Sequence, residues 1–240
     1  MKDTKLTFKR FEKKYLLSPQ KFALLWSELE PHLTPDLYFR STVCSIYYDS
    51  DDYALIRHSL EQPVYKEKLR LRSYGVPGPE DPVFVELKKK FRGVVYKRRV
   101  QLGADAARDY LAGKSRPESE GQILREIDYF LQFNRVSPKA FIACEREAWV
   151  DREDPELRIT FDRDLRWRDT ELDLTAGSRG EPLLDEGEVL MEIKIPQAAP
   201  LWLAHLLSDL SIFPGAFSKY GTCYRRHLLE KFYNGVIVCV

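Results

Sequence analysis

Apolar and polar residues alternate with period two along much of the chain, which is the pattern of β-strands that bury one face. The clearest case is YKEKLRLRS (65–73), where every second residue is a cation: Lys66, Lys68, Arg70 and Arg72. A strand directs alternate side chains to the same side, so these like charges would repel one another. The pattern therefore predicts that something on this side of the strand offsets the repulsion.

The same alternation predicts eight strands in all. Many of them have an apolar face and a charged face, with charges of both signs but mostly positive. A turn rich in proline and glycine (76–82) and a polar loop (178–188) separate some of the strands. The predicted strands are 7–17, 43–50, 65–73, 83–90, 94–102, 140–150, 157–165 and 189–195.

Helical segments are fewer. Ser18 is a candidate N-cap with Pro19 at the first helical position, and residues 119–134 carry apolar side chains at helical spacing. We find no internal repeat, low-complexity segment or linker, which favours a single domain over 1–240. The predicted helices are 18–30, 51–60, 104–113, 119–134, 197–210 and 222–233.

Composition permits a sizeable core, with 44% hydrophobic and 31% charged residues among the 240. Lys and Arg number 38 and Asp and Glu 37, so the formal net charge is only +1. This balance argues against a broad basic surface for nucleic acid. Any binding of anions must come from local clustering of cations.

The four cysteines form no CxxC pair, which favours free thiols in a reducing compartment. The four histidines lack metal-ligand spacing. The N-terminus lacks the apolar stretch of a signal peptide, and no segment approaches the roughly 20 apolar residues that span a bilayer. We therefore expect a cytoplasmic protein without a transmembrane segment.

Two architectures fit the alternation. In the first, an antiparallel sheet buries one face and exposes the charged face to water. In the second, eight strands close into a barrel with the charged faces inside and amphipathic helices covering the outside. Buried like charges are costly, so this interior would require anions, and phosphate chains match the bidentate geometry of arginine.

Three glutamates stand among the cations: Glu12, Glu86 and Glu192. Carboxylates beside bound phosphates suit Mg²⁺ or Mn²⁺. For Glu12 and Glu86, an ion pair with a lysine on a neighbouring strand is an equally good interpretation. Glu192 is the stronger metal candidate because it lies in the otherwise apolar strand LMEIKI, where a charge needs a partner.

The order of these motifs resembles a known family, the VTC domain, which is the polyphosphate polymerase domain of the vacuolar transporter chaperone family. That family belongs to the triphosphate tunnel metalloenzyme (CYTH-like) superfamily. The resemblance runs from about residue 8 to residue 233. It rests on RxExKY (10–15), KLRLRSYG (68–75), VFVELKKK (83–90), CEREAW (144–149), LRITFDRDL (157–165), LMEIKI (190–195) and FSKYG (217–221).

The resemblance implies an α+β fold with a closed eight-stranded antiparallel tunnel. It also implies transfer of the γ-phosphate of ATP to inorganic polyphosphate, with Mn²⁺ or Mg²⁺ as cofactor. Catalytic roles are implied for Lys14, Arg70, Arg72, Lys88, Arg146, Arg158 and Lys219, substrate binding for Lys97, Arg99, Ser218, Lys194, Lys66 and Lys68, and metal binding for Glu192, Glu86 and Glu12.

Some roles stay open at this level. Lys97 and Arg99 are alternatives for one basic position. Lys66 and Lys68 either guide the polyanion or are solvated lysines at the end of a strand. A triphosphatase or polyphosphatase of the same fold, or a non-catalytic polyphosphate-binding module, are the alternative functions. Relative to the eukaryotic proteins, we expect neither an N-terminal sensor domain nor a translocating segment. Regulation, oligomeric state and any membrane-protein partner are therefore not predicted.

Overall fold

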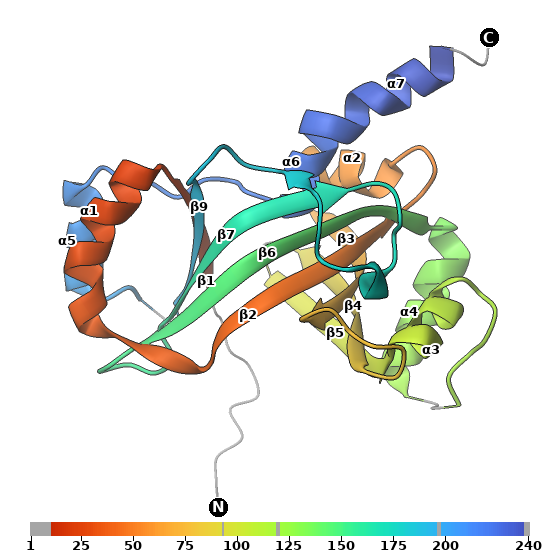
Figure 1. The fold of residues 1–240 in the computed structure, drawn as a ribbon, viewed down its shortest axis with the longest axis horizontal. Helices are drawn as coiled ribbons and strands as arrows, with labels where there is room; N and C mark the ends of the chain where they lie inside the picture. Colours follow the sequence, from red (N-terminus) through yellow and green to blue (C-terminus); the bar gives the residue numbers. More distant parts are fainter. Residues whose placement is uncertain (1–10, 93, 119–120, 196–197, 238–240) are drawn as a thin grey trace, which may run out of the picture. The chain divides into compact units, whose positions relative to one another are not determined.

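The computed structural model describes residues 11–92, 94–118, 121–195 and 198–237 (Figure 1). Predicted strand residues 7–10, parts of two predicted helices and Cys239 lie outside the described residues. The strands are β1 (Phe11–Leu17), β2 (Leu33–Asp49), β3 (Tyr65–Tyr74), β4 (Pro82–Phe91), β5 (Val94–Gly103), β6 (Ser137–Asp151), β7 (Arg158–Arg168), β8 (Glu181–Pro182) and β9 (Val189–Ile195). The α-helices are α1 (Pro19–Leu29), α2 (Ala54–Leu60), α3 (Ala104–Leu111), α4 (Gln122–Asn134), α5 (Leu201–Asp209), α6 (Lys219–Cys223) and α7 (Leu229–Ile237), with short helical turns η1 (Glu30–His32), η2 (Leu174–Ala176) and the π-helical η3 (Tyr224–Leu228).

The strands form one nine-stranded sheet in the order β1-β9-β7-β6-β2-β3-β4-β5, with β8 attached to β7. The pairings of β1 with β9, β9 with β7, and β2 through β5 in succession are antiparallel. The order ends at β1 and at β5, and no pairing between described residues joins these two strands. The predicted antiparallel sheet is confirmed, whereas its closure into a barrel is not.

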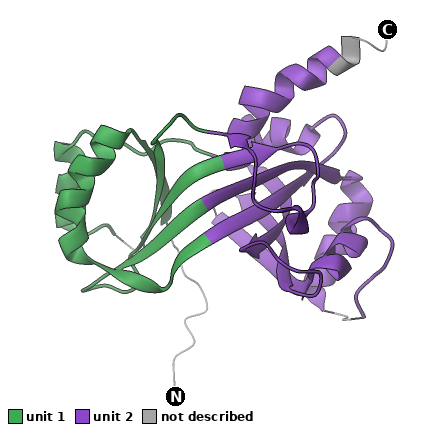
Figure 2. Cartoon of the chain, in the orientation of Figure 1, with its two compact units in different colours: residues 1–41, 145–165, 184–217 green, residues 42–144, 166–183, 218–240 purple. Residues whose placement is uncertain are grey.

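The chain divides into two compact units that interleave in sequence (Figure 2). Unit 1 comprises residues 1–41, 145–165 and 184–217, and unit 2 comprises 42–144, 166–183 and 218–240. Strands β2, β6 and β7 contribute residues to both. The single-domain organisation stays a prediction.

In unit 2, the apolar face of the sheet packs under helices α3 and α4, which lie side by side in Figure 1. Alternate residues of β3 and β4 enter this core, and the amphipathic helices supply the other side. Each fully buried large side chain contributes about 1.5–3 kcal/mol. The core includes Leu69, Leu71, Val83, Val85 and Leu87 from the sheet, and Tyr110, Leu124, Ile127 and Phe130 from the helices.

In unit 1, helices α1 and α5 pack together and cover the apolar face of β1, β7 and β9. Helix α1 begins as predicted, with the Ser18 hydroxyl accepting a hydrogen bond from the Lys21 backbone N–H and Pro19 in the first turn. The core includes Leu25 and Leu29 of α1, Leu203 and Leu207 of α5, and Ile159, Phe161, Met191 and Ile193 of the strands. The prediction that amphipathic helices cover the apolar faces is therefore confirmed in both units.

The main departure from the predicted elements is the first half of β2. Residues 33–42 do not alternate between apolar and polar side chains. The consecutive apolar residues Leu37 and Tyr38 lie on opposite faces of the strand, and both are exposed. The local sequence of this half of the strand therefore lacks the signal that predicts the other strands. The predicted helix 222–233 also begins earlier, at Lys219, and passes through the π-helical turn η3.

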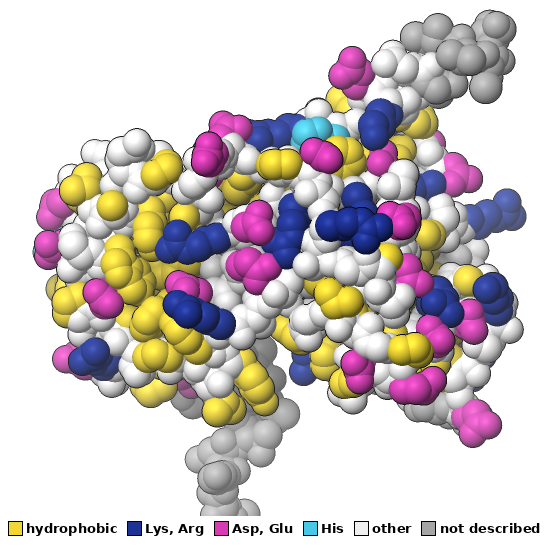
Figure 3. All heavy atoms as spheres, in the orientation of Figure 1, with side chains coloured by type: hydrophobic (Ala, Val, Ile, Leu, Met, Phe, Trp, Pro, Cys, Tyr) yellow, Lys and Arg dark blue, Asp and Glu magenta, His cyan; other side chains and the backbone are white. Residues whose placement is uncertain are grey.

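Two surface properties bear on the partners of the protein. On the face seen in Figure 3, Lys and Arg side chains lie among Asp and Glu side chains rather than in one basic expanse, as a net charge of +1 leads one to expect. Within the described residues, the helices are all too short or too polar to cross a bilayer.

Candidate anion-binding site

One face of β3, β4 and β5 in unit 2 carries three lysines in a row across the sheet. Lys68 lies opposite Lys88, and Lys88 lies opposite Lys97. Directly opposed residues of antiparallel strands have Cβ atoms about 4.5–5.5 Å apart, where like charges destabilise the sheet. We call these three residues the lysine row. An anion with several charges would relieve their repulsion.

The neighbouring row contains the single carboxylate of this face. Glu86 lies between Arg70 on β3 and Arg99 on β5 and is only 1% exposed. Its Oε2 accepts hydrogen bonds from Arg70 Nε at 2.8 Å and Nη2 at 2.6 Å, and its Oε1 forms an ion pair with Lys97. Burial raises the pKa of Glu86, but the surrounding cations, Arg70 first, outweigh burial and lower the pKa to about 2. Glu86 is thus an internal counter-ion for the cationic face.

Arg70 and Arg72 are held from the other side by β2. Arg72 Nε donates to Ser45 Oγ at 3.2 Å, and Arg70 Nη1 lies 3.5 Å from the Tyr47 hydroxyl. Burial raises the pKa of Tyr47, but the neighbouring cations, Arg70 first, outweigh burial and lower it. The predicted arginine pair is therefore oriented by residues that the sequence did not single out.

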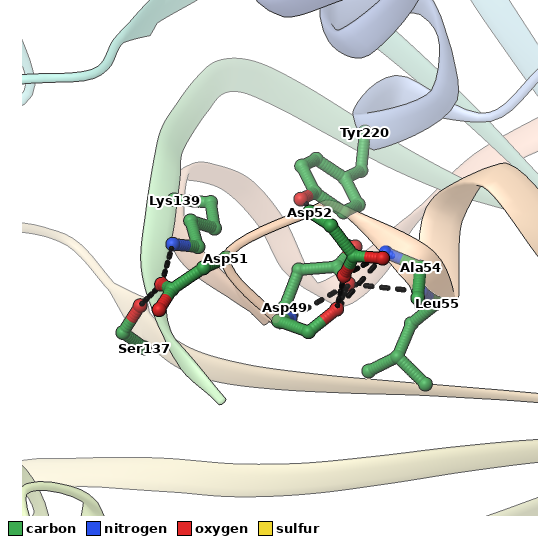
Figure 4. Close-up of polar contacts among 9 residues, drawn as sticks. Asp49, Asp51, Asp52, Ala54, Leu55, Ser137, Lys139 and Tyr220 are labelled. Atoms are coloured by element: carbon green, nitrogen blue, oxygen red, sulfur yellow. Dashed lines mark hydrogen bonds and ion pairs between the residues drawn. The ribbon is translucent and has the colours of Figure 1, made fainter. Parts of the chain in front are cut away.

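Tyr47 is in turn fixed by a buried network at the base of α2 and α6. Its ring stacks on Tyr220, with centroids 4.9 Å apart. The Tyr220 hydroxyl donates to Asp49 at 3.1 Å, and Asp49 also accepts from the backbone N–H groups of Leu55 and Ile56 at the start of α2 (Figure 4). Burial, followed by the Asp49 charge, raises the pKa of Tyr220, which therefore stays a neutral donor.

Removal of the Tyr220 hydroxyl tests this network. We expect Tyr220→Phe to lower the free energy of unfolding by about 1–3 kcal/mol, because a buried carboxylate loses a hydrogen bond. Urea denaturation measures the change, with Tyr129→Phe as the control, since Tyr129 is 68% exposed on α4. Equal stability of the two variants would contradict a buried Tyr220–Asp49 bond.

The predicted Ser218–Lys219 pair lies at the beginning of α6. The Ser218 hydroxyl caps the helix by accepting from the Gly221 N–H at 3.1 Å, and it also accepts from Lys68 Nζ at 3.0 Å. Lys219 Nζ lies 2.9 Å from the sulfur of buried Cys144 on β6. The Ser218–Lys68 contact brings this C-terminal motif to the charged face of β3.

Two further predicted residues border this face. Lys66 Nζ donates to the Ser59 carbonyl at 3.0 Å, and the guanidinium of Arg99 lies over the Phe84 ring, 4.7 Å from its centroid. Burial, followed by repulsion from Lys90, lowers the pKa of Lys66. Lys97, by contrast, forms an ion pair with Glu86. The two alternative residues on β5 therefore have different contacts.

Unit 1 holds a second charged cluster on β1 and β9. Glu12 lies opposite Lys194, and Lys14 lies opposite Glu192, so the signs alternate along and across the strands. Lys14 Nζ is 3.6 Å from Glu12 and 3.7 Å from Glu192, and Lys194 Nζ is 3.5 Å from Glu192. Burial raises the pKa of Glu192, but the two ammonium groups, Lys14 first, lower it overall.

The two predicted arginines of unit 1 are each paired with an aspartate. Arg146 on β6 forms a bidentate pair with buried Asp162 on β7, at 2.5 and 2.7 Å. Arg158 on β7 pairs with Asp36 on β2. Such pairing fixes the guanidinium planes, which favours defined contacts with phosphate oxygens.

Metal binding stays a prediction for Glu192, Glu12 and Glu86, and the contacts of Glu86 favour the ion-pair interpretation for that residue. Carboxylate oxygens suit Mn²⁺ and Mg²⁺, and Glu192 makes only long ion pairs with lysines. Both oxygens of Glu86 are engaged by Arg70 and Lys97, which matches the ion-pair interpretation. Among the described residues, no three His, Cys, Asp or Glu side chains gather as a ready metal cage, so water or phosphate would have to complete the coordination.

Sequence reasoning missed the residues that hold the predicted cations in place. Asp162 could have been found, because it shares the charged face of its strand with Arg158 and Thr160. Asp36 could not, because its segment has no alternation. The missed residues are Ser45, Tyr47, Asp49, Cys144 and Tyr220 in unit 2, and Asp36 and Asp162 in unit 1.

Residues 9–227 match the sequence model of the VTC domain. The chain belongs to the VTC domain family. The match confirms the resemblance that the sequence motifs predicted, over residues 9–227 of the 240-residue chain.

A curated relative of this VTC domain is subunit 4 of the vacuolar transporter chaperone complex of Trypanosoma cruzi. The two are 24% identical over 208 aligned positions, and the match covers 66% of this chain and 25% of the relative. The chain thus matches about a quarter of the length of that protein.

Solved structures also resemble the VTC domain. The putative adenylyl cyclase HpAC1 from Hippeastrum, whose title states a dominant triphosphatase activity, is 16% identical, with a TM-score of 0.52 and coverage of 89% of this chain and 94% of its own. This similarity establishes a shared fold only. PH1819 from Pyrococcus horikoshii OT3 is 12% identical with a TM-score of 0.46 over 92% of this chain and 99% of its own.

Proposed function

We propose that this VTC domain binds the phosphate groups of ATP and inorganic polyphosphate and transfers the γ-phosphate of ATP to the polyphosphate chain. The observation that carries the proposal is the lysine row, Lys68, Lys88 and Lys97, placed beside the oriented Arg70 and Arg72. Cations repelling one another across three strands form a site for a polyanion. Membership of the VTC family supports this choice of polyanion.

Each unit holds its own candidate phosphate-binding residues. In unit 2, the lysine row and Lys219 would neutralise phosphate oxygens, while Arg70 is kept in position by Glu86 and Tyr47. Unit 1, taken by itself, has its own set of fixed positive charges: Lys14 and Arg146 act on Glu192, and Arg158 lies opposite Lys194. Phosphoryl transfer depends mainly on positioning and charge neutralisation, so no covalent nucleophile is required.

A divalent cation, Mn²⁺ or Mg²⁺, held by Glu192 with Glu12 as a second carboxylate, would neutralise charge on phosphate oxygens in unit 1. The two lysines beside Glu192 keep its carboxylate ionised at neutral pH, which is the form that binds a metal.

The lysine row is tested by two adjacent residues on opposite faces of β4. We expect Lys88→Ala to weaken the binding of tripolyphosphate about 10- to 100-fold, because one charged hydrogen bond contributes about 1.5–3 kcal/mol. Lys89→Ala is the matched control, since Lys89 points to the other face and pairs with Glu126 at 3.1 Å. We expect its affinity to stay within about threefold of the wild type.

Isothermal titration calorimetry at two salt concentrations measures both affinities. Binding through the lysine row should weaken as salt rises, and less steeply in the Lys88→Ala variant. Equal losses of affinity in the two variants would place the polyanion elsewhere.

Hydrolysis is the second candidate activity, because the same cations would serve transfer of the phosphoryl group to water. Incubation with ATP and Mn²⁺ followed by gel electrophoresis separates the two activities. We expect long anionic chains; release of free phosphate without chains would instead assign a triphosphatase or polyphosphatase.

A further inference from the structure

The end of the β4–β5 hairpin in unit 2 exposes an unusual number of apolar side chains. Tyr65 lies opposite Phe91, and Phe91 lies opposite Val94, so three apolar residues form a row across β3, β4 and β5. They are 44%, 44% and 47% exposed. We call Tyr65, Phe91 and Val94 the apolar row. Val64, Val95 and Tyr96 beside it are also exposed.

Helix α4, which packs against β5, extends this apolar surface. Its Tyr129 and Phe133 are 68% and 74% exposed, and their rings stack with centroids 6.0 Å apart. Glu126 on the same helix pairs with Lys89 and Arg98, which places α4 beside this part of the hairpin. Exposed aromatic side chains in a group of this size mark an interaction surface.

The charge around the apolar row is positive. The segment 88–99, KKKFRGVVYKRR, contains seven Lys and Arg and no Asp or Glu. Lys90 lies opposite Lys66 on the other side of the hairpin, and the exposed Arg92 stacks over the Phe91 ring. Two carboxylates on this side of the hairpin, Glu67 and Glu126, pair with Lys89, and Glu126 also pairs with Arg98. Lys90 and Arg92 therefore flank the apolar row with positive charge.

We propose that this hairpin end binds the surface of an anionic lipid bilayer. Apolar and aromatic side chains enter the boundary between headgroups and acyl chains, while adjacent Lys and Arg pair with anionic headgroups. Each basic residue near such a surface contributes to binding, and the contribution is weakened by salt. The apolar row and its flanking cations supply both components within one hairpin. This binding is separate from the proposed phosphoryl transfer, because Phe91 and Val94 lie on the face of the hairpin opposite the lysine row.

Vesicle co-sedimentation tests the proposal with the full chain. We expect the wild type to bind phosphatidylcholine vesicles that contain phosphatidylserine at least about tenfold more tightly than pure phosphatidylcholine vesicles. The double variant Phe91→Ser/Val94→Ser should lose at least about tenfold in affinity for the anionic vesicles. Lys90→Glu/Arg92→Glu should lose a similar factor, and raised salt should narrow the difference from the wild type.

The matched control is Leu37→Ser/Tyr38→Ser, which removes two other exposed apolar residues, on β2. We expect it to bind anionic vesicles like the wild type. The Phe91→Ser/Val94→Ser variant and the β2 control should keep the wild-type affinity for tripolyphosphate, which separates this proposal from the candidate site. The proposal would be overturned if the wild type did not bind anionic vesicles, or if the β2 control lost as much affinity as Phe91→Ser/Val94→Ser. It would also be overturned by a dimer in solution that Phe91→Ser/Val94→Ser abolishes, because the surface would then bind a second copy of the chain.

Discussion

Replacement of Glu86 by glutamine is expected to lower the free energy of unfolding by about 3 kcal/mol at neutral pH, because it leaves Arg70 and Lys97 without the buried carboxylate that pairs with both. Glu86 is 1% exposed and pairs with both Arg70 and Lys97. Removing its charge leaves the partly buried Arg70 and the more exposed Lys97 facing each other without a counter-ion. Urea denaturation monitored by circular dichroism measures the loss.

The loss should depend on pH in a defined direction. The pKa of Glu86 falls from an ordinary value of 4.5 to about 2 in the folded protein. The stability that this carboxylate contributes is therefore present above pH 4.5 and disappears as the pH falls toward 2. A shift of this size corresponds to about 3 kcal/mol. The difference between wild type and Glu86→Gln should thus be largest at neutral pH and nearly absent near pH 2.

Glu80→Gln is the control for this experiment, since Glu80 lies on an exposed turn before β4. We expect a change within about 0.5 kcal/mol. A Glu86→Gln variant as stable as this control, or a difference that stays constant across the acid range, would show that Glu86 is not the counter-ion of the cationic face.

Substitution of Glu192 by glutamine is expected to reduce Mn²⁺-dependent turnover of ATP by about a hundredfold or more, since a bound metal contributes several kcal/mol of charge stabilisation. Binding of tripolyphosphate without metal should change by less than about threefold, because the lysine row is intact. Turnover measured across a range of Mn²⁺ concentrations distinguishes metal binding from a structural role. A metal ligand shifts the concentration of Mn²⁺ needed for half-maximal turnover, whereas a purely structural residue does not.

Glu28→Gln on the exposed side of α1 is the matched control in unit 1. Circular dichroism should show that both variants are folded. Wild-type turnover in Glu192→Gln would remove the metal role from this residue. If tripolyphosphate binding fell as much as turnover, Glu192 would instead have a structural role, keeping Lys14 and Lys194 in position.

The candidate site could be predicted in outline because the cations occur at alternate positions of recognisable strands. Period-two alternation assigns Lys68, Arg70 and Arg72 to one face whatever the strand pairs with. Register is a different matter. That Lys68, Lys88 and Lys97 form a row, while Glu86 falls between Arg70 and Arg99, depends on how β3, β4 and β5 align. A slip of one residue would separate these rows.

The partners of the cations could not be predicted, since each comes from a distant part of the chain. Tyr47 and Tyr220 are 173 residues apart in number yet stack at 4.9 Å, and Asp36 reaches Arg158 from a segment that has no strand pattern. Hydrogen bonds over such separations follow from tertiary packing, which local periodicity does not encode.

By itself, the sequence determined the positions of the main strands and helices, the apolar and charged faces, and the VTC family, because local alternation and ordered motifs carry that information. Only the tertiary structure decided that Glu86 is an internal counter-ion, that the arginines are held by aspartates and tyrosines, and that the described sheet is not closed between β1 and β5. The physical reason is that strand register and side-chain pairing are properties of contacts between segments, and a buried charge selects its partner only when those segments meet.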